Sequence, residues 1–105
     1  MSGVALVYCP FPDADIAHSA ARTLVTERLA ACANILSPCL SLYEWNGALE
    51  ESSEVPVLFK TTQASAPALM TRIAELHPYE VPAIVRWDAR DAFPPFLAWV
   101  AGQVK

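Results

Sequence analysis

Residues 41–49 read Ser-Leu-Tyr-Glu-Trp-Asn-Gly-Ala-Leu and predict a tight β-hairpin at the centre of the chain. The pair Asn46-Gly47 tolerates the positive φ angles that a two-residue turn between antiparallel strands requires. We expect the first arm over residues 31–45, with a bulge or a change of facing at Pro38 because proline cannot donate to a strand ladder. The returning arm is expected over residues 49–60, where apolar residues alternate.

These arms are long for a chain of this size. Each arm of about 12 to 15 residues would extend about 40 Å at roughly 3.3 Å per residue, whereas typical strands have about five or six residues. The hairpin would then overhang the domain and expose large apolar side chains, namely Leu40, Leu42, Tyr43 and Trp45. Because natural proteins cover such edges, the simplest cover is another copy of the chain. The alternative is that Pro38 and Pro56 break the arms into short strands that fold back on one body.

The elements around the hairpin predict the fold class. We expect a strand over residues 4–9 that stops at Pro10-Phe11-Pro12, a helix from Asp13 to near Leu29, a helix from Ser65 to His77, a strand over residues 81–87, and a helix behind Pro94. With the hairpin, the order is β-α-β-β-α-β-α. This order favours an α+β ferredoxin-like sandwich, with a four-stranded antiparallel sheet that carries its main helices on one face. Residues 1–105 are predicted to form a single domain.

Composition and charge narrow the function classes. The 105 residues are 54% hydrophobic and 17% charged, which is typical of a globular chain. No apolar stretch is long enough to span a bilayer, and the N-terminus lacks the pattern of a signal peptide, so we expect a cytoplasmic protein. Three cysteines, an odd number, indicate free thiols in a reducing compartment. A net charge of −4 without a run of Lys or Arg argues against nucleic-acid and membrane partners.

The segment Leu76-His77-Pro78-Tyr79-Glu80-Val81-Pro82 is the strongest candidate for chemistry. Two prolines disfavour helical geometry at the residues before them, so the backbone is extended or turned and stiff. Such a loop can present the imidazole, the phenol and the carboxylate between the prolines to a ligand. A helix stop followed by a strand is also ordinary architecture, and both interpretations stay open at this point.

Several stretches together resemble one known family. They are Phe11-Pro12-Asp13, the run from Leu29 to Ile35, Ser41 to Trp45 before the glycine turn, Lys60-Thr61-Thr62, and Leu76 to Pro82. In this order, over nearly the whole chain, they resemble the CutA family of divalent-cation tolerance proteins. The resemblance implies a ferredoxin-like fold assembled as a homotrimer, with the long hairpins between subunits. It also implies an architecture similar to that of the trimeric PII signalling proteins, whose ligand sites lie in clefts between subunits.

The resemblance further implies metal binding and a role in the response to metal ions. The family is associated with copper, and the residues that match its suggested ligands are Cys9, Cys32 and His77. Thiolate and imidazole donors suit copper or zinc, so copper or another divalent cation is the expected cofactor. In a ferredoxin-like sheet Cys9 and His77 can approach each other, whereas Cys32 should lie near the opposite edge. A site with all three ligands would need a neighbouring subunit or a bent strand.

The alternative function is that of a PII-like sensor, which would bind a small anion or nucleotide between subunits. Its candidate cleft residues are Tyr43, Trp45, Lys60, His77 and Glu80. Packing at a subunit interface is the other interpretation of the two aromatic residues.

An enzyme would need Cys9 as nucleophile, His77 as base and Glu80 as orienting acid. The chain has three glycines and no glycine-rich nucleophile turn, so an oxyanion-stabilising arrangement and a dinucleotide fingerprint are both missing from the sequence. We therefore predict a protein without catalytic activity.

Overall fold

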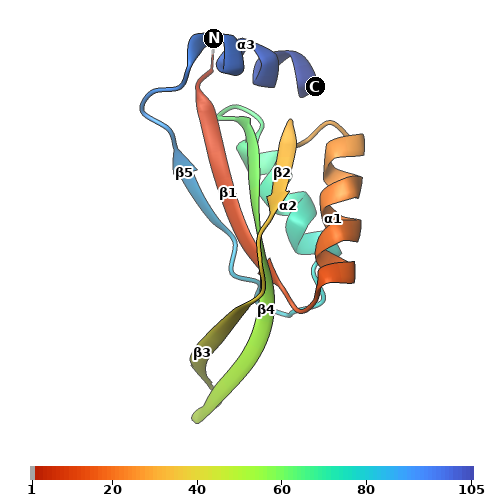
Figure 1. Ribbon diagram of the computed structural model, residues 1–105, viewed down its shortest axis with the longest axis vertical. Helices are drawn as coiled ribbons and strands as arrows, with labels where there is room; N and C mark the ends of the chain where they lie inside the picture. The colour runs from red at the N-terminus through yellow and green to blue at the C-terminus, as the bar shows by residue number, and fades with distance from the viewer. Residues whose placement is uncertain (1) are drawn as a thin grey trace.

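The computed structural model describes residues 2–105 and has an α+β fold (Figure 1). Its elements are β1 (Val4–Phe11), α1 (Ala14–Thr26), β2 (Cys32–Ile35), β3 (Cys39–Trp45), β4 (Ala48–Thr62), α2 (Ala66–Leu76), β5 (Val85–Asp88) and α3 (Pro94–Gln103). The predicted fold class is confirmed. The sheet has five strands rather than the four expected, because the first hairpin arm is divided at Pro38 into β2 and β3.

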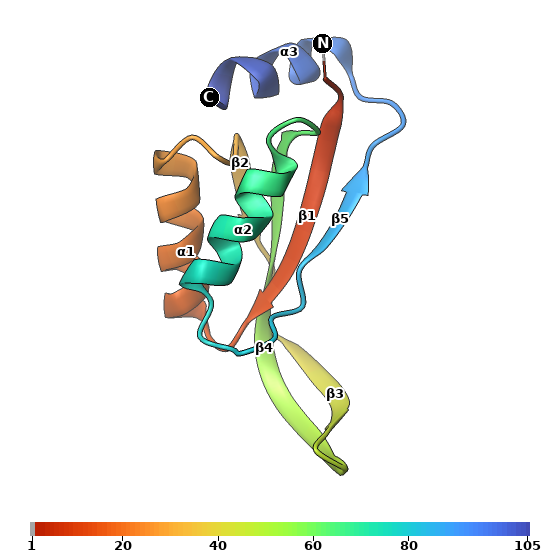
Figure 2. The ribbon, with the colours of Figure 1, turned by 180° about the vertical axis from the view of Figure 1, so that it is seen from behind.

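The strand order is β2-β4-β1-β5, with β3 paired to the outer part of β4, and every pair is antiparallel. Helices α1 and α2 cover one face of the sheet, and α3 lies across its end beside the N-terminus (Figure 2). We call the sheet face opposite α1 and α2 the open face. Strand β4 is central and contacts three other strands, so its residues decide which side chains share a face.

The core lies between the sheet and the two covering helices. Its largest fully buried side chains include Phe11, Leu24, Phe59 and Leu69. Alternation along β1 and β4 supplies the sheet side of this core, as the sequence pattern predicts. A smaller cluster on the open face joins α3 to the sheet through Val4, Ala31 and Val100.

Helix α1 is capped at its start by Asp13, whose Oδ1 accepts a hydrogen bond from the Ile16 N–H at 2.8 Å. It ends at Thr26, three residues before the predicted end, because Arg28 adopts a positive φ of 62°. The Arg28 side chain donates to the Gln103 carbonyl oxygen at 2.9 Å. The end of α1 is therefore tied to the end of α3.

Two strand boundaries differ from the prediction. Strand β1 continues past Pro10 to Phe11, because Pro10 lies opposite Pro56 in the ladder and neither residue has an N–H that needs an acceptor. Strand β5 begins at Val85 rather than residue 81, since Pro82 holds the preceding segment in a turn in which the Ile84 N–H donates to the Pro82 carbonyl oxygen at 3.1 Å.

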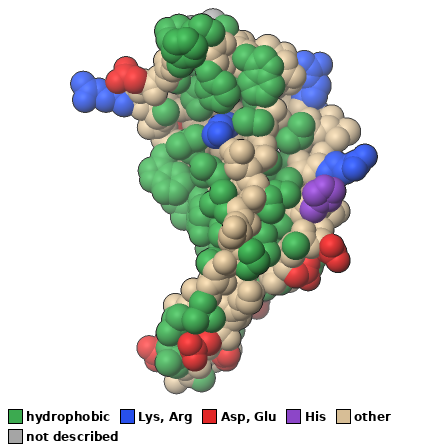
Figure 3. Space-filling view, in the orientation of Figure 1, with side chains coloured by type: hydrophobic (Ala, Val, Ile, Leu, Met, Phe, Trp, Pro, Cys, Tyr) green, Lys and Arg blue, Asp and Glu red, His purple; other side chains and the backbone are tan. Residues whose placement is uncertain are grey.

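The hairpin of β3 and the outer part of β4 projects beyond the body of the domain (Figure 1). Its turn has φ angles of 53° at Asn46 and 79° at Gly47, which confirms the predicted tight turn. Leu40, Leu42 and Leu49 are 66%, 57% and 70% exposed, so this arm does not fold back on the body. In Figure 3 its tip carries hydrophobic and acidic side chains together.

Within residues 2–105, no helix combines the length and the apolarity that crossing a bilayer demands.

Candidate functional site

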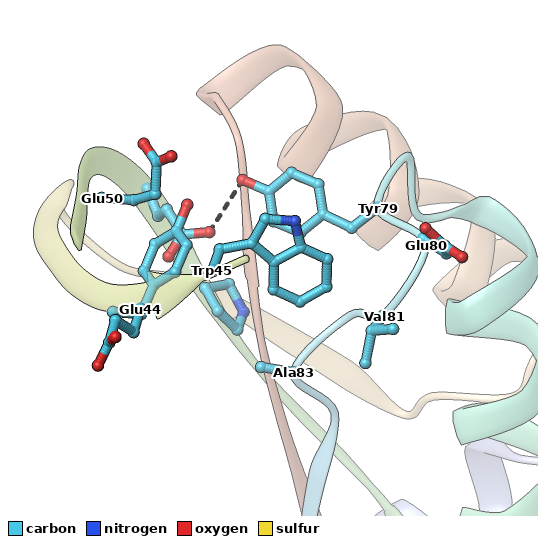
Figure 4. A pocket seen from close by; sticks show the side chains of 10 residues that line it. Glu44, Trp45, Glu50, Tyr79, Glu80, Val81 and Ala83 are labelled. Atoms are coloured by element: carbon cyan, nitrogen blue, oxygen red, sulfur yellow. Dashed lines mark hydrogen bonds between the residues drawn. The ribbon is translucent and has the colours of Figure 1, made fainter. Parts of the chain in front are cut away.

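A cavity of about 660 Å³ lies between the projecting hairpin and the loop that follows α2. Figure 4 shows the side chains that line it, which come from the end of β1, from both hairpin strands and from that loop. The lining residues are Pro10, Tyr43, Glu44, Trp45, Glu50, Glu54, Tyr79, Glu80, Val81 and Ala83. We call this cavity the hairpin pocket.

His77 anchors the loop that forms one wall of the hairpin pocket. Its backbone is extended, with φ −79° and ψ 136°, as expected for the residue before a proline. Its Nε2 lies 2.8 Å from the Pro10 carbonyl oxygen, and its Nδ1 accepts the Tyr79 N–H at 3.1 Å. Because a carbonyl oxygen only accepts, Nε2 carries the proton. The ring is buried and stacks on Phe11 at a centroid distance of 4.8 Å. Both ring nitrogens are thus engaged within the chain.

Tyr79, two residues after His77, lines the pocket and connects the loop to the hairpin. Its hydroxyl donates a hydrogen bond to Glu54 Oε2 at 3.0 Å, and Glu54 is only 6% exposed. Burial, followed by the hydrogen bond to Glu54, raises the pKa of Tyr79 to about 12. Tyr79 is therefore a neutral donor at physiological pH, and the bond joins the loop to the base of the hairpin.

The hairpin pocket is strongly acidic. Four of its lining residues are glutamates, and none is Lys, Arg or His. The ion pairs found among residues 2–105 join Arg72 to Glu27 and Glu75, and Arg86 to Asp88, so none of them neutralises a pocket glutamate. The potential inside the pocket favours a cationic ligand.

The structure brings two of the three predicted metal ligands close together. Cys9 Sγ lies 3.6 Å from the same Pro10 carbonyl oxygen that His77 contacts. The thiol is fully buried, and this burial raises the pKa of Cys9 to about 12, so the thiolate that would bind a metal is disfavoured.

Cys32 is not brought to the other two. Cys9 pairs with Val57 of β4, whereas Cys32 pairs with Lys60. Val57 and Lys60 are an odd number of residues apart, so they face opposite sides of the sheet. Cys9 therefore points toward the helices, while Cys32 lies on the open face.

The residues of one chain consequently do not fit a metal held by Cys9, Cys32 and His77. Within the part of the chain that the structure describes, residues 2–105, no group of three or more His, Cys, Asp or Glu side chains could hold an ion. Binding of a metal ion by donors from more than one copy of the chain stays a prediction.

The predicted cleft residues divide into two groups. Tyr43, Trp45 and Glu80 line the hairpin pocket. Lys60 is elsewhere, because its Nζ donates to Asn34 Oδ1 at 2.7 Å and lies 5.9 Å from the centre of the Phe96 ring. The pocket of one chain thus lacks the cation that an anionic ligand would need.

Sequence reasoning missed three glutamates of the pocket, namely Glu44, Glu50 and Glu54. The one available signal concerned Glu54, which directly precedes the apolar run of β4 and so enters the sheet at its buried end.

The nucleophile, base and acid of the enzyme hypothesis are not assembled in this chain. The His77 nitrogens contact backbone groups of Pro10 and Tyr79 rather than Cys9 Sγ or the Glu80 carboxylate.

Comparisons with known proteins agree with this fold. Residues 5–103 match the family model described as CutA1 divalent ion tolerance protein. The divalent-cation tolerance protein CutA of Pyrococcus horikoshii is 43% identical, over 95% of this chain and 97% of its own length. Protein CutA of Mus musculus is 38% identical over 92% of this chain, which spans only 55% of the mouse protein. The crystal structure of CutA from Xylella fastidiosa superposes with a TM-score of 0.95 at 35% identity, covering 99% of this chain and 100% of that one.

Proposed function

Because this chain belongs to the CutA1 family of divalent ion tolerance proteins, we propose that it acts in divalent-cation tolerance as a cytoplasmic homotrimer that binds metal ions, copper among them. The single observation that carries the proposal is the family match over residues 5–103. Three free cysteines support a reducing compartment.

The projecting hairpin supports the homotrimer. Its leucines would be an aggregation hazard in an isolated chain, and association with further copies would cover them. The same association would bring donors of neighbouring chains together along the hairpin and the open face.

We propose that the metal ion is bound between copies rather than inside one. Of the two predicted thiol ligands, Cys32 is the better donor for such a site, because it is partly exposed whereas Cys9 is buried. Burial raises its pKa, but the Lys60 charge opposes that rise. Cys9 and His77 would have to give up buried packing and two hydrogen bonds to contribute.

A PII-like role for the hairpin pocket is less well supported. An anion or nucleotide would meet four glutamates there without a compensating lysine or arginine of the same chain. The acidity of the pocket therefore favours cations over the alternative ligand class.

Copper titration, combined with sedimentation analysis, tests this proposal. We expect a trimeric mass and a metal affinity that falls in Cys32→Ser but not in Cys9→Ser, its matched control. A monomeric mass at all concentrations would contradict the homotrimer. Equal affinity in all three proteins would contradict the thiol site, and loss of affinity in Cys9→Ser alone would move the site to the core.

A further inference from the structure

The hairpin pocket holds a buried carboxylate that has no cationic partner. Glu54 is only 6% exposed, yet among residues 2–105 it forms no ion pair. We propose that the hairpin pocket binds the ammonium group of a small organic amine, with Glu54 as counter-ion and the surrounding aromatic rings as its walls. This inference does not depend on the metal site proposed above.

The charge on Glu54 is only partly compensated. One carboxylate oxygen, Oε2, accepts the Tyr79 hydroxyl. No protein donor contacts the other oxygen within residues 2–105, and that oxygen is open to solvent rather than sealed in the core. A buried carboxylate normally has an ion-pair partner or several hydrogen bonds, since its desolvation is costly. Because Glu54 also lines the pocket, a cation bound there would supply the missing partner.

Glu54 lies near two other ionisable side chains, Tyr79 and Cys9. Desolvation is the main cause of the raised pKa of both Tyr79 and Cys9, and the negative charge of Glu54 contributes to each. The local potential is therefore negative on the loop side and on the sheet side of Glu54.

Three aromatic residues, Tyr43, Trp45 and Tyr79, line the same pocket. In Figure 4 Trp45 and Tyr79 lie between the hairpin, which carries Glu44 and Glu50, and the loop that carries Val81. Aromatic faces attract alkylammonium ions through the ring quadrupole, and Trp is the strongest of them. Val81 and Ala83 add an apolar wall suited to an alkyl chain.

The same features disfavour other ligands. Metal ions need several convergent donors, and no group of three is present in residues 2–105. A cavity of about 660 Å³ is also far larger than a bare ion. Anions would be repelled by the glutamates. Carboxylates combined with aromatic faces fit a cation that carries apolar carbon.

NMR titration of the intact protein with n-butylammonium chloride tests the proposal, with n-butanol and sodium butyrate as neutral and anionic isosteres. The Trp45 indole N–H resonance is identified by its loss in Trp45→Phe. We expect it to shift saturably with n-butylammonium only. Glu54→Gln should weaken binding about tenfold or more, as expected for loss of a partly buried counter-ion.

Glu51→Gln is the matched control, because Glu51 neighbours Glu50 on the hairpin but does not line the pocket. It should bind the amine as the wild type does. If Glu54→Gln fails to fold, Tyr43→Leu serves instead, because Tyr43 lines the pocket from the hairpin and the variant keeps the Trp45 reporter; it should also weaken binding. Equal response to butanol or butyrate, unchanged binding in the folded pocket variants, or displacement of the amine by equimolar Zn²⁺ would overturn the proposal.

Discussion

The body of the domain and its projecting hairpin use the same apolar residue types in opposite environments. Phe59 and Leu69 in the body are fully buried, whereas Leu42 and Leu49 on the hairpin are more than half exposed. Phe59 and the two hairpin leucines all lie in antiparallel strands, so backbone pairing does not distinguish the sheet of the body from the hairpin. The body obtains its stability from its own chain, and the hairpin has only its ladder until something else covers it.

The candidate ligand site lies at the boundary between these two regions. The hairpin pocket lies where the two regions meet, and Glu54 is the residue at which β4 passes from the exposed arm into the buried sheet. One wall of the pocket is the loop of the body that carries Tyr79 to Ala83, while the opposite wall is the projecting hairpin. Ligand binding and assembly are therefore expected to influence each other.

Truncation of a core ring should give the largest effect. Phe59→Ala is expected to lower the free energy of unfolding by about 3 to 5 kcal/mol, because it removes buried surface and leaves a cavity. Urea denaturation followed by circular dichroism measures this change. Leu42→Ala on the hairpin is the comparison, and its cost should depend on protein concentration. If both variants lost a similar free energy of unfolding at every protein concentration, the hairpin would be stabilised by its own chain as the body is, and the distinction between the two regions would be wrong.

A charge on the hairpin should act on assembly rather than on folding. Leu42→Lys would place an ammonium group opposite Glu51 in the ladder, which keeps the hairpin paired. If Leu42 is buried between subunits, the substitution would also remove about 2 kcal/mol of favourable apolar burial for each leucine replaced. We expect a shift from trimer toward monomer in sedimentation, with the helical signal retained. Val25→Lys on the exposed surface of α1 is the control and should leave the mass unchanged; a trimer that persists in Leu42→Lys would show that the hairpin is not the interface.

One buried hydroxyl should have an intermediate effect. Thr61 is fully buried, and its Oγ1 donates to the Leu29 carbonyl oxygen at 2.8 Å. Thr61→Val keeps the shape but leaves that carbonyl without this donor, so we expect a loss of about 1 to 2 kcal/mol. Chemical denaturation of Thr61→Val beside the exposed Thr71→Val measures it, and equal stability of the two variants would contradict the role of this bond.

The smallest effect should come from the ion pair between the two covering helices. Both nitrogens Nε and Nη2 of Arg72 donate to Glu27 at 2.9 Å, and this bonding lowers the pKa of Glu27 from its usual 4.5. A lowered folded-state pKa means that the stabilisation is complete above the unfolded value and is lost as pH falls through the folded value. The stability difference between wild type and Glu27→Gln should thus be small at pH 7 and vanish in acid. A difference that grows as pH falls would contradict this sign.

Local patterns explain how much of the fold was predictable. Alternation, the Asn46-Gly47 turn and the prolines predicted the order of helices and strands, with an interruption at Pro38 that in the structure divides the expected single arm into β2 and β3. The boundaries that failed depend on distant partners. Strand β1 passes through Pro10 because Pro56 lies opposite, and α1 stops early at Arg28, whose side chain reaches α3.

The candidate site was predictable only in part, for the same reason. Residues 76–82 were identified as the chemical segment because two prolines mark it, and Trp45 and Glu80 do line one pocket. The hydrogen bond between His77 and Pro10 and that between Tyr79 and Glu54 join segments far apart in sequence, and no local pattern reports them.

The sequence by itself determined the order of elements, the overlong hairpin and the family, since turn chemistry, periodicity and motif order are local or cumulative properties. Only the tertiary structure decided that Cys9 and Cys32 face opposite sides of the sheet and that His77 has no free nitrogen. The physical reason is that the faces of a strand alternate with every residue. The pairing register along β4, which no single segment encodes, therefore decides which side chains can meet.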